Sequence, residues 1–152
     1  MTILKEGDKA PAIKAETDTG EIFELAAHKG EKIILYFYPR ADTPGCTVEA
    51  CEFRDTSKKI VKKGALIVGV SPDTSKAQSK FKTKFDLPFI LLADADKKVC
   101  EAYGVMKEKN MYGKKVMGVA RTTFLIDEEG KIAKIFTNVK PEGHADQVIA
   151  SL

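Results

Sequence analysis

Three short apolar runs constrain the fold of this chain more than any other feature of its sequence. They span residues 33–38, 66–70 and 89–92, and prolines follow the first two at Pro39 and Pro72. Runs of this length, rich in β-branched and aromatic residues, are typical of strands that are buried on both faces. Helical lengths of chain separate them, which predicts βαβ units around a parallel sheet.

Helix signals lie between and after these runs. Thr43 is a predicted N-cap, and Pro44 follows at the first helical position. This helix is expected to end at Lys62-Lys63-Gly64, where cations and a glycine favour a C-terminus. Further helices are predicted at residues 75–85, 96–103 and 144–152.

Two hairpins complete the predicted order of elements. Residues 119–126 and 131–136 flank a loop that contains glycine, which predicts an antiparallel pair. A smaller hairpin is expected near the N-terminus, with its turn at residues 18–21. The stretch at 104–118, which contains glycine and methionine, is expected to be irregular.

The order β-α-β-α-β-α-β-β-α predicts one α/β domain over residues 1–152, with a central mixed sheet flanked by helices. The chain has 152 residues, of which 43% are hydrophobic and 31% charged, and this composition supports a single buried core. The net charge of +3 is mild, and basic and acidic residues are interleaved, so nucleic-acid binding is not expected. No membrane span or secretory signal is recognised, which favours a cytoplasmic protein without a membrane partner.

The cysteine and histidine content limits the possible chemistry. The three cysteines are Cys46, Cys51 and Cys100, and an odd number argues against a disulfide framework. A closed zinc site needs four cysteine or histidine ligands in paired short spacings. His28 and His144 lie far from the cysteines in sequence, so neither a metal nor another cofactor is expected.

Cys46 occupies the third position of the helix predicted after Thr43. Backbone N–H groups there lack helical partners, and the positive end of the helix dipole favours a thiolate. Gly45 would let a small substrate approach the backbone closely, and the Thr43 hydroxyl can donate or accept a hydrogen bond. The alternative is that Cys46 is simply a small apolar residue in the first helical turn.

Cys51 lies five residues after Cys46. An intact helix would hold their Cα atoms roughly 8.6 Å apart, which exceeds the limit of about 7 Å for a disulfide. A bond between them therefore requires the first turns to unwind, and Thr47 and Val48 are mediocre helix formers that permit this. The alternative for Cys51 is an ordinary core residue. Cys100 is expected to be a packing residue, and a reserve resolving role is the other possibility.

The segment YPRADTPGCTVEAC at residues 38–51 resembles the active-site signature of the peroxiredoxins, Pro39-x3-Thr43-x2-Cys46. With its second cysteine five residues on, it is similar to the bacterioferritin comigratory protein, or peroxiredoxin Q, subfamily. Segments at 7–11, 121–127 and 138–144 also resemble that subfamily. The resemblance covers essentially the whole chain.

This resemblance implies a thioredoxin-like fold and thiol-dependent reduction of hydrogen peroxide and organic hydroperoxides. By position, Cys46 would be the peroxidatic cysteine and Cys51 the resolving cysteine, joined by an intramolecular disulfide. Thioredoxin or a similar dithiol would recycle the enzyme, which is expected to be a monomer or a weak dimer. The resemblance assigns thiolate and peroxide contacts to Thr43 and Arg121, and shielding of the site to Pro39.

The chemistry of these residues agrees with that assignment. The charge that develops on the leaving oxygen needs hydrogen-bond donors. The N–H groups of Gly45 and Cys46, the Thr43 hydroxyl and the Arg121 guanidinium could supply them. Without the resemblance, Arg121 would read as an exposed cation at the start of a strand. Glu49, one turn after Cys46, could orient Arg121 or lie on a solvated helix face.

Two other functions remain open from the sequence. One is a thioredoxin-like disulfide oxidoreductase, although that class uses Cys-x-x-Cys, whereas four residues separate Cys46 from Cys51. The other is a non-enzymatic peroxide sensor or interaction protein, which would react once rather than turn over with a reductant.

Overall fold

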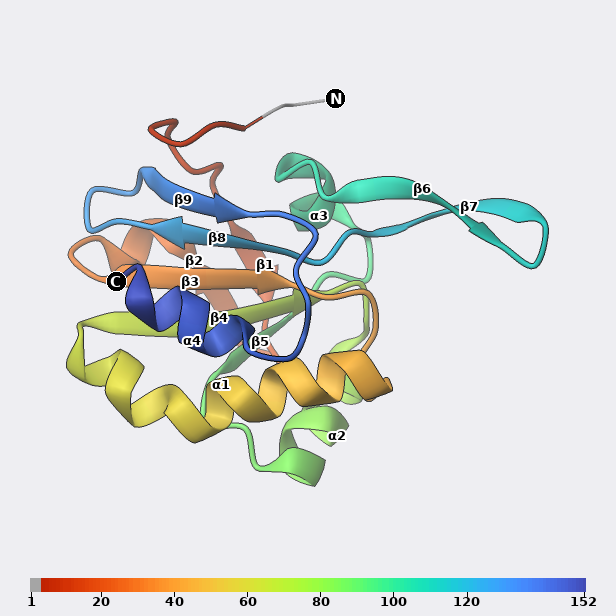
Figure 1. Ribbon diagram of the computed structural model, residues 1–152, viewed down its shortest axis with the longest axis horizontal. Helices are drawn as coiled ribbons and strands as arrows, with labels where there is room; N and C mark the ends of the chain where they lie inside the picture. Colours follow the sequence, from red (N-terminus) through yellow and green to blue (C-terminus); the bar gives the residue numbers. More distant parts are fainter. Residues whose placement is uncertain (1–3) are drawn as a thin grey trace.

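The computed structural model describes residues 4–152, apart from the side chains at positions 109 and 111. Strand β3 (Lys32–Phe37) lies at the centre of a five-stranded sheet with the order β5-β4-β3-β8-β9 (Figure 1). It pairs in parallel with β4 (Ala65–Ser71), which pairs in parallel with β5 (Ile90–Ala93). On its other side it pairs antiparallel with β8 (Thr122–Ile126), and β8 pairs antiparallel with β9 (Ile132–Phe136). The predicted mixed sheet is confirmed.

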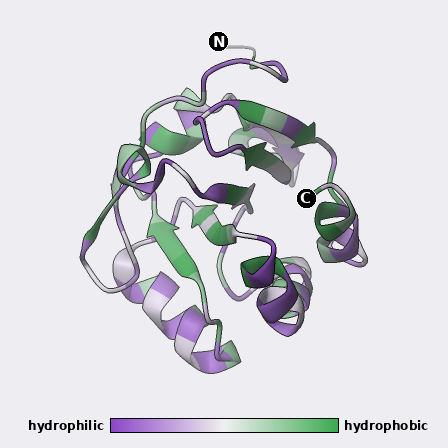
Figure 2. Cartoon of the chain, turned by 90° about the vertical axis from the view of Figure 1, so that its left-hand side faces the viewer, coloured by the Kyte–Doolittle hydropathy of each residue, from purple (hydrophilic) through white to green (hydrophobic). Residues whose placement is uncertain are grey.

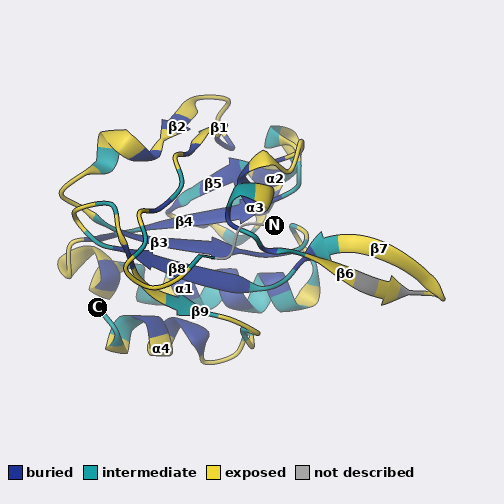
Figure 3. Ribbon diagram, turned by 90° about the horizontal axis from the view of Figure 1, so that it is seen from above, coloured by how far each residue is buried: buried dark blue, intermediate teal, exposed yellow. Residues whose placement is uncertain are grey.

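Strand β3 is buried on both faces, as its apolar run predicts. Ile33, Leu35 and Phe37 belong to the core on one side of the sheet, whereas Ile34 and Tyr36 belong to the core on the other. Side chains alternate between the faces of a strand, so a run without polar residues fits only a strand with covered faces. Figures 2 and 3 show hydrophobic and buried residues concentrated on these central strands.

Helices cover both faces of the sheet. Buried side chains of α1 (Pro44–Lys62), α2 (Ser75–Phe85) and α4 (His144–Ala150) share one core. Buried residues of α3 (Lys98–Ala102) and of the N-terminal hairpin share the other. The helices predicted at 75–85 and after Thr43 are confirmed. The helices predicted at 96–103 and 144–152 are present but shorter.

The N-terminal hairpin predicted around residues 18–21 is also confirmed. Strand β1 (Lys14–Glu16) pairs antiparallel with β2 (Ile22–Glu24), and the short 3-10 helix η1 (Leu25–His28) follows. Phe23 and Leu25 anchor this segment in the core. An isolated bridge between Thr17 and Leu92 fixes the hairpin beside β5.

The prediction of an irregular stretch at 104–118 is wrong. Strand β6 (Met106–Met111) and β7 (Lys114–Val119) form an antiparallel hairpin that projects from the body (Figures 1 and 3). Tyr112 and Gly113 form its turn with φ of 54° and 78°, the combination that a two-residue hairpin turn requires. Val119 therefore belongs to β7 rather than to the strand predicted at 119–126.

His144 is a buried histidine at the start of α4, with 1% of its surface exposed. Its Nε2 lies 2.7 Å from Thr123 Oγ1, and its Nδ1 lies 3.2 Å from Gln147 Oε1. Because an amide oxygen only accepts, Nδ1 carries the proton and the Thr123 hydroxyl donates to Nε2. Burial lowers the pKa of His144, although Gln147 opposes this effect. The folded protein therefore favours the neutral ring.

This burial predicts acid-sensitive stability. The folded-state pKa lies below the value of 6.5 for a free histidine, so the unfolded chain takes up the proton first as pH falls. The free energy of unfolding should therefore decrease below about pH 6.5. The variant His144→Gln should lose this part of the decrease, although losing the Thr123 hydrogen bond makes it less stable at neutral pH. Urea unfolding between about pH 5 and pH 7.5 measures both effects. Equal pH dependence in the two proteins would contradict the assignment.

Candidate active site

Cys46 lies in the first turn of α1, the helix that follows the central strand β3 after a short loop. Thr43 is the N-cap in an extended conformation, Pro44 is the first helical residue, and Thr47 N donates to Thr43 O at 2.8 Å. The local signals of the sequence therefore place Cys46 as predicted. Only 1% of its surface is exposed, and it packs in the same core as Ala50.

Arg121 contacts the Cys46 sulfur, although it lies 75 residues later in the sequence. It lies between β7 and β8, and its Nη1 donates to Cys46 Sγ at 3.4 Å and to Glu49 Oε1 at 3.1 Å. The arginine side chain is only 18% exposed, so the alternative interpretation of Arg121 as an exposed cation at the start of a strand is wrong. Burial lowers the pKa of Arg121, but Cys46 and Glu49 together raise it by more. The guanidinium therefore stays charged beside the sulfur.

Glu49 is a buried carboxylate and not part of a solvated helix face. It is 1% exposed, and burial raises its pKa to about 7 even though Arg121 opposes the shift. Its spacing from Cys46 places both side chains on the same side of α1. That spacing was the only signal in the sequence, and it did not distinguish burial from solvation. The structure adds Glu49 to the site as the residue that holds Arg121.

The space above Gly45 is filled by protein. A Cβ atom at this position would lie 3.1 Å from Arg121 Nη2 and 3.4 Å from Pro141 Cγ. A side chain here would therefore push against the guanidinium. The absence of a side chain at Gly45, which the sequence suggests would admit a substrate, therefore also makes room for Arg121.

Thr43 and Pro39 flank the site in the segment between β3 and α1. The Thr43 hydroxyl donates to Arg40 O at 3.0 Å and does not cap the helix. Its oxygen keeps lone pairs that can accept a further hydrogen bond. Pro39 is half-buried, two residues after the end of β3. Within the described residues, no hydrogen bond joins Thr43 to Cys46 or Arg121.

Cys51 lies on the same uninterrupted helix as Cys46. Both thiols are free, and Cys51 is partly exposed rather than fully buried. Arg54, less than one turn later, donates through Nη1 to Phe85 O at 2.8 Å. This bond ties the Cys51 region of α1 to the C-terminal end of α2. With α1 intact, the two sulfurs cannot bond.

Comparisons with known proteins follow the same residues. The chain matches the AhpC/TSA family over residues 6–135. It is 52% identical to a Bcp-type peroxiredoxin of Coxiella burnetii over 98% of this chain and 99% of that protein. It is 46% identical to peroxiredoxin Bcp of Bacillus subtilis over 100% and 96% of the two chains. A structure of the bacterioferritin comigratory protein of Xanthomonas campestris superimposes with a TM-score of 0.87, at 41% identity, over 91% of this chain and 88% of that one.

The chain belongs to the AhpC/TSA family and is a peroxiredoxin. The predicted resemblance and the thioredoxin-like fold are both confirmed. No described helix of this peroxiredoxin is long and apolar enough to cross a membrane. Over the described residues, no cluster of three or more histidine, cysteine or acidic side chains is arranged to hold a metal ion.

Cys100 lies on the opposite side of the sheet from Cys46. It is fully buried in the core with β2 and α3, whereas Cys46 belongs to the core beneath α1. Burial raises the pKa of the Cys100 thiol, and the nearby Asp94 raises it further. Asp94 also accepts the Cys100 N–H at 2.8 Å. These features favour the packing role over a reserve resolving role.

Two buried polar atoms near the site lack a hydrogen-bond partner within the described part of the chain. They are Glu49 Oε2 and the hydroxyl of Tyr36. Burial raises the pKa of Tyr36, with smaller contributions from Tyr38, Glu49 and Cys46. An unsatisfied buried group costs about 1–3 kcal/mol. The start of α1 is therefore less stable than a fully satisfied helix would be.

The variant Glu49→Gln tests the hold on Arg121. Glutamine keeps an acceptor oxygen but no charge, so above about pH 7 the neutral contact should hold the guanidinium less firmly. The single-turnover rate of Cys46 with hydrogen peroxide should then fall about tenfold at pH 8. The wild-type rate should rise through pH 7 more steeply than the variant's. Ultraviolet absorbance of the thiolate, measured in both proteins, separates this effect from thiol ionisation. Superimposable pH–rate profiles would rule out the role.

At alkaline pH, Glu49→Gln should also have a larger free energy of unfolding than the wild type. The folded-state pKa of about 7 exceeds the free value of 4.5, so the ionised form is penalised in the fold. Stability is therefore lost as pH rises through about 7, and Glu49→Gln should resist this loss. Urea unfolding at pH 6 and pH 8 measures the difference. A variant that is less stable at both pH values would contradict this prediction.

Proposed function

We propose that this peroxiredoxin reduces hydrogen peroxide and organic hydroperoxides through Cys46, forms an intramolecular disulfide with Cys51, and is recycled by thioredoxin or a similar dithiol. The observation that carries the proposal is the 3.4 Å contact between the Arg121 guanidinium and the Cys46 sulfur at a helix N-terminus. The Xanthomonas relative supports the substrate class, because its structure is described in terms of alkyl peroxide reduction.

The first step is attack of the Cys46 thiolate on a peroxide oxygen. A sulfur–oxygen bond forms, the oxygen–oxygen bond breaks, and the sulfur is oxidised by two electrons. The leaving oxygen takes up a proton and departs as water or an alcohol, and Cys46 becomes a sulfenic acid.

Stabilisation of the leaving oxygen is the larger contribution to the rate. A thiol of ordinary pKa is about 3% ionised at pH 7, so complete ionisation gains only about 30-fold. Lower thiol pKa also weakens the nucleophile. The Arg121 guanidinium, the first-turn N–H groups of Gly45 and Cys46, and the Thr43 hydroxyl supply donors to the developing charge. Pro39 limits access of water to these groups.

Access to the sulfur favours small or slender peroxides. Cys46 is 1% exposed, whereas the Arg121 side chain beside it is 18% exposed. A substrate therefore approaches along the guanidinium. An alkyl group of an organic hydroperoxide would remain on the outer side of the site.

The second step is attack of Cys51 on the sulfenic acid. A disulfide forms, and the hydroxyl leaves with a proton as water. Because the intact helix keeps the sulfurs apart, the first turns of α1 must unwind. Oxidation itself weakens the hold on this turn, since a neutral sulfenic acid attracts the Arg121 guanidinium less than a thiolate does.

The third step restores both thiols. A thiolate of the reductant attacks the Cys46–Cys51 disulfide, which forms a mixed disulfide and releases one thiol of the peroxiredoxin. The second thiol of the reductant then attacks the mixed disulfide and releases the other thiol of the peroxiredoxin. Two electrons and two protons pass from the dithiol to the peroxiredoxin. A sensor would lack this turnover, and a disulfide oxidoreductase would not consume peroxide.

Single cysteine variants separate the roles. Cys46→Ser should abolish peroxide turnover because it removes the nucleophile. Cys51→Ser should react once and leave Cys46 as a sulfenic acid, which intact mass shows as a gain of one oxygen. Wild-type protein treated with one equivalent of hydrogen peroxide should instead lose two hydrogens and yield a Cys46–Cys51 peptide.

The variant Cys100→Ser is the matched control, and its turnover should equal that of the wild type. Full turnover by Cys46→Ser would overturn the mechanism. A Cys46–Cys100 peptide would transfer the resolving role to Cys100.

A further inference from the structure

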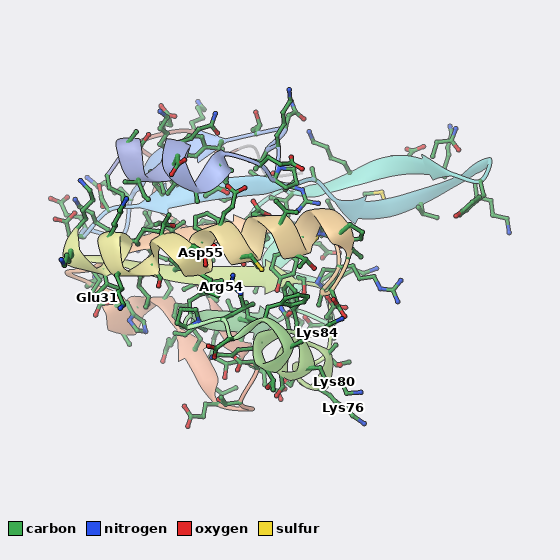
Figure 4. The ribbon with its side chains drawn as sticks, turned by 60° about the horizontal axis from the view of Figure 1, so that its bottom comes forward. Glu31, Arg54, Asp55, Lys76, Lys80 and Lys84 are labelled. Carbon is green, nitrogen blue, oxygen red and sulfur yellow. The ribbon has the colours of Figure 1, made fainter. Side chains whose placement is uncertain are left out.

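Helix α2 carries a strongly basic surface next to the proposed redox site. Its eleven residues, SKAQSKFKTKF, include four lysines and no acidic residue. Lys76, Lys80 and Lys84 recur at four-residue spacing, so they share one face of the helix. All three are exposed, and Figure 4 shows them in a row along α2. We call these three lysines, together with Arg40, the α2 basic face.

Part of this face is not neutralised by the protein. Lys84 pairs with Asp42 at 2.9 Å, and Lys82, outside the face, pairs with Asp18 at 3.2 Å. In the part of the chain that the structure describes, Lys76 and Lys80 form no ion pair. Their charges are therefore available to an external partner.

A cavity of about 620 Å³ joins the face to the segment that precedes Cys46. Arg40, Ala41 and Asp42 line one wall, and residues of α2, among them Lys80 and Phe81, line the other. A partner that rests on the lysines could place a side chain into this hollow. The hollow ends one residue before Thr43, the N-cap of the helix that must unwind.

The face also adjoins the second cysteine. Arg54, three residues after Cys51, donates to the carbonyl of Phe85 at the C-terminal end of α2. The Lys84–Asp42 pair connects α2 to the start of α1. Helix α2 therefore contacts both ends of the segment that contains Cys46 and Cys51, and a protein that reaches their disulfide passes next to α2.

We infer that the α2 basic face is the docking surface for an acidic protein dithiol, the reductant of the Cys46–Cys51 disulfide. This inference rests on the proposed function. Charge complementarity favours such a partner over a second copy of the chain, because two copies meeting through this face would bring lysines together. Steering between opposite charges accelerates encounter while leaving the complex short-lived, which suits a reductant that must leave after each cycle.

The test compares two reductants in hydrogen peroxide turnover. One is an acidic bacterial thioredoxin kept reduced by its reductase, and the other is dithiothreitol, which is small, uncharged and needs no docking surface. The test variant is Lys76→Glu/Lys80→Glu, which leaves the Lys84–Asp42 pair intact. The matched control is Lys58→Glu/Lys62→Glu, the same charge change at the same spacing near the far end of α1.

The test variant should lower kcat/KM for thioredoxin about tenfold at low ionic strength, mainly through KM, and added salt should shrink the difference. Turnover with dithiothreitol and single-turnover oxidation should match the wild type, and the control variant should retain the wild-type kinetics with thioredoxin.

An unchanged kcat/KM in the test variant, or an equal loss in the control, would overturn the inference. Loss of binding to a DNA duplex with intact thioredoxin kinetics would also overturn it and assign the face to nucleic acid. Wild-type protein that consumes no peroxide even with dithiothreitol would instead refute the proposed function.

Discussion

The contact of the Arg121 guanidinium with Cys46 and Glu49 is the interaction on which the rest of the site depends. One cation lies between a sulfur and a carboxyl group, each 1% exposed, so both buried groups contact the same cationic partner. Removing Arg121 would leave the sulfur and the carboxyl group without their shared cation in a poorly solvated place. The contact also joins two distant parts of the chain, since Arg121 directly precedes β8 and Cys46 lies in the first turn of α1. A Cβ atom at position 45 would lie only 3.1 Å from Arg121 Nη2.

The same contact creates a conflict between stability and chemistry. It fixes the first turn of α1, yet the proposed disulfide requires that turn to open, because Cys51 lies five helical residues after Cys46. The structure weakens the turn in two ways: Glu49 Oε2 lacks a hydrogen-bond partner among the described residues, and the Thr43 hydroxyl bonds to Arg40 rather than capping the helix. In the proposed cycle, oxidation would convert the sulfur to a neutral sulfenic acid, which attracts Arg121 less than a thiolate does. In that cycle, the same guanidinium would bind the Cys46 sulfur before oxidation and hold it less firmly afterwards.

Local sequence signals predict most of the strands and helices, but they carry no information about which distant residues come into contact. The apolar run at 33–38 could only be a strand with two covered faces, and Thr43-Pro44 set the start of α1. The proximity of Arg121 to Cys46 joins positions 75 residues apart, so only the resemblance to a family indicated it. The burial of Glu49 depends on that contact and stayed open for the same reason. The β6–β7 hairpin was missed because its lysine-rich strands bury little apolar surface and so show no clear alternation.

The most direct test of this account is the single-turnover rate of hydrogen peroxide with Arg121→Lys, measured together with the thiolate absorbance of Cys46. Lysine keeps the charge but loses the planar guanidinium, whose Nη1 donates to both Cys46 and Glu49. The account predicts a fall of about 10²-fold in rate, far larger than any fall in thiolate content, because the guanidinium acts mainly on the leaving oxygen. A rate that stays at the wild-type level, or that falls only in proportion to the thiolate lost, would contradict it.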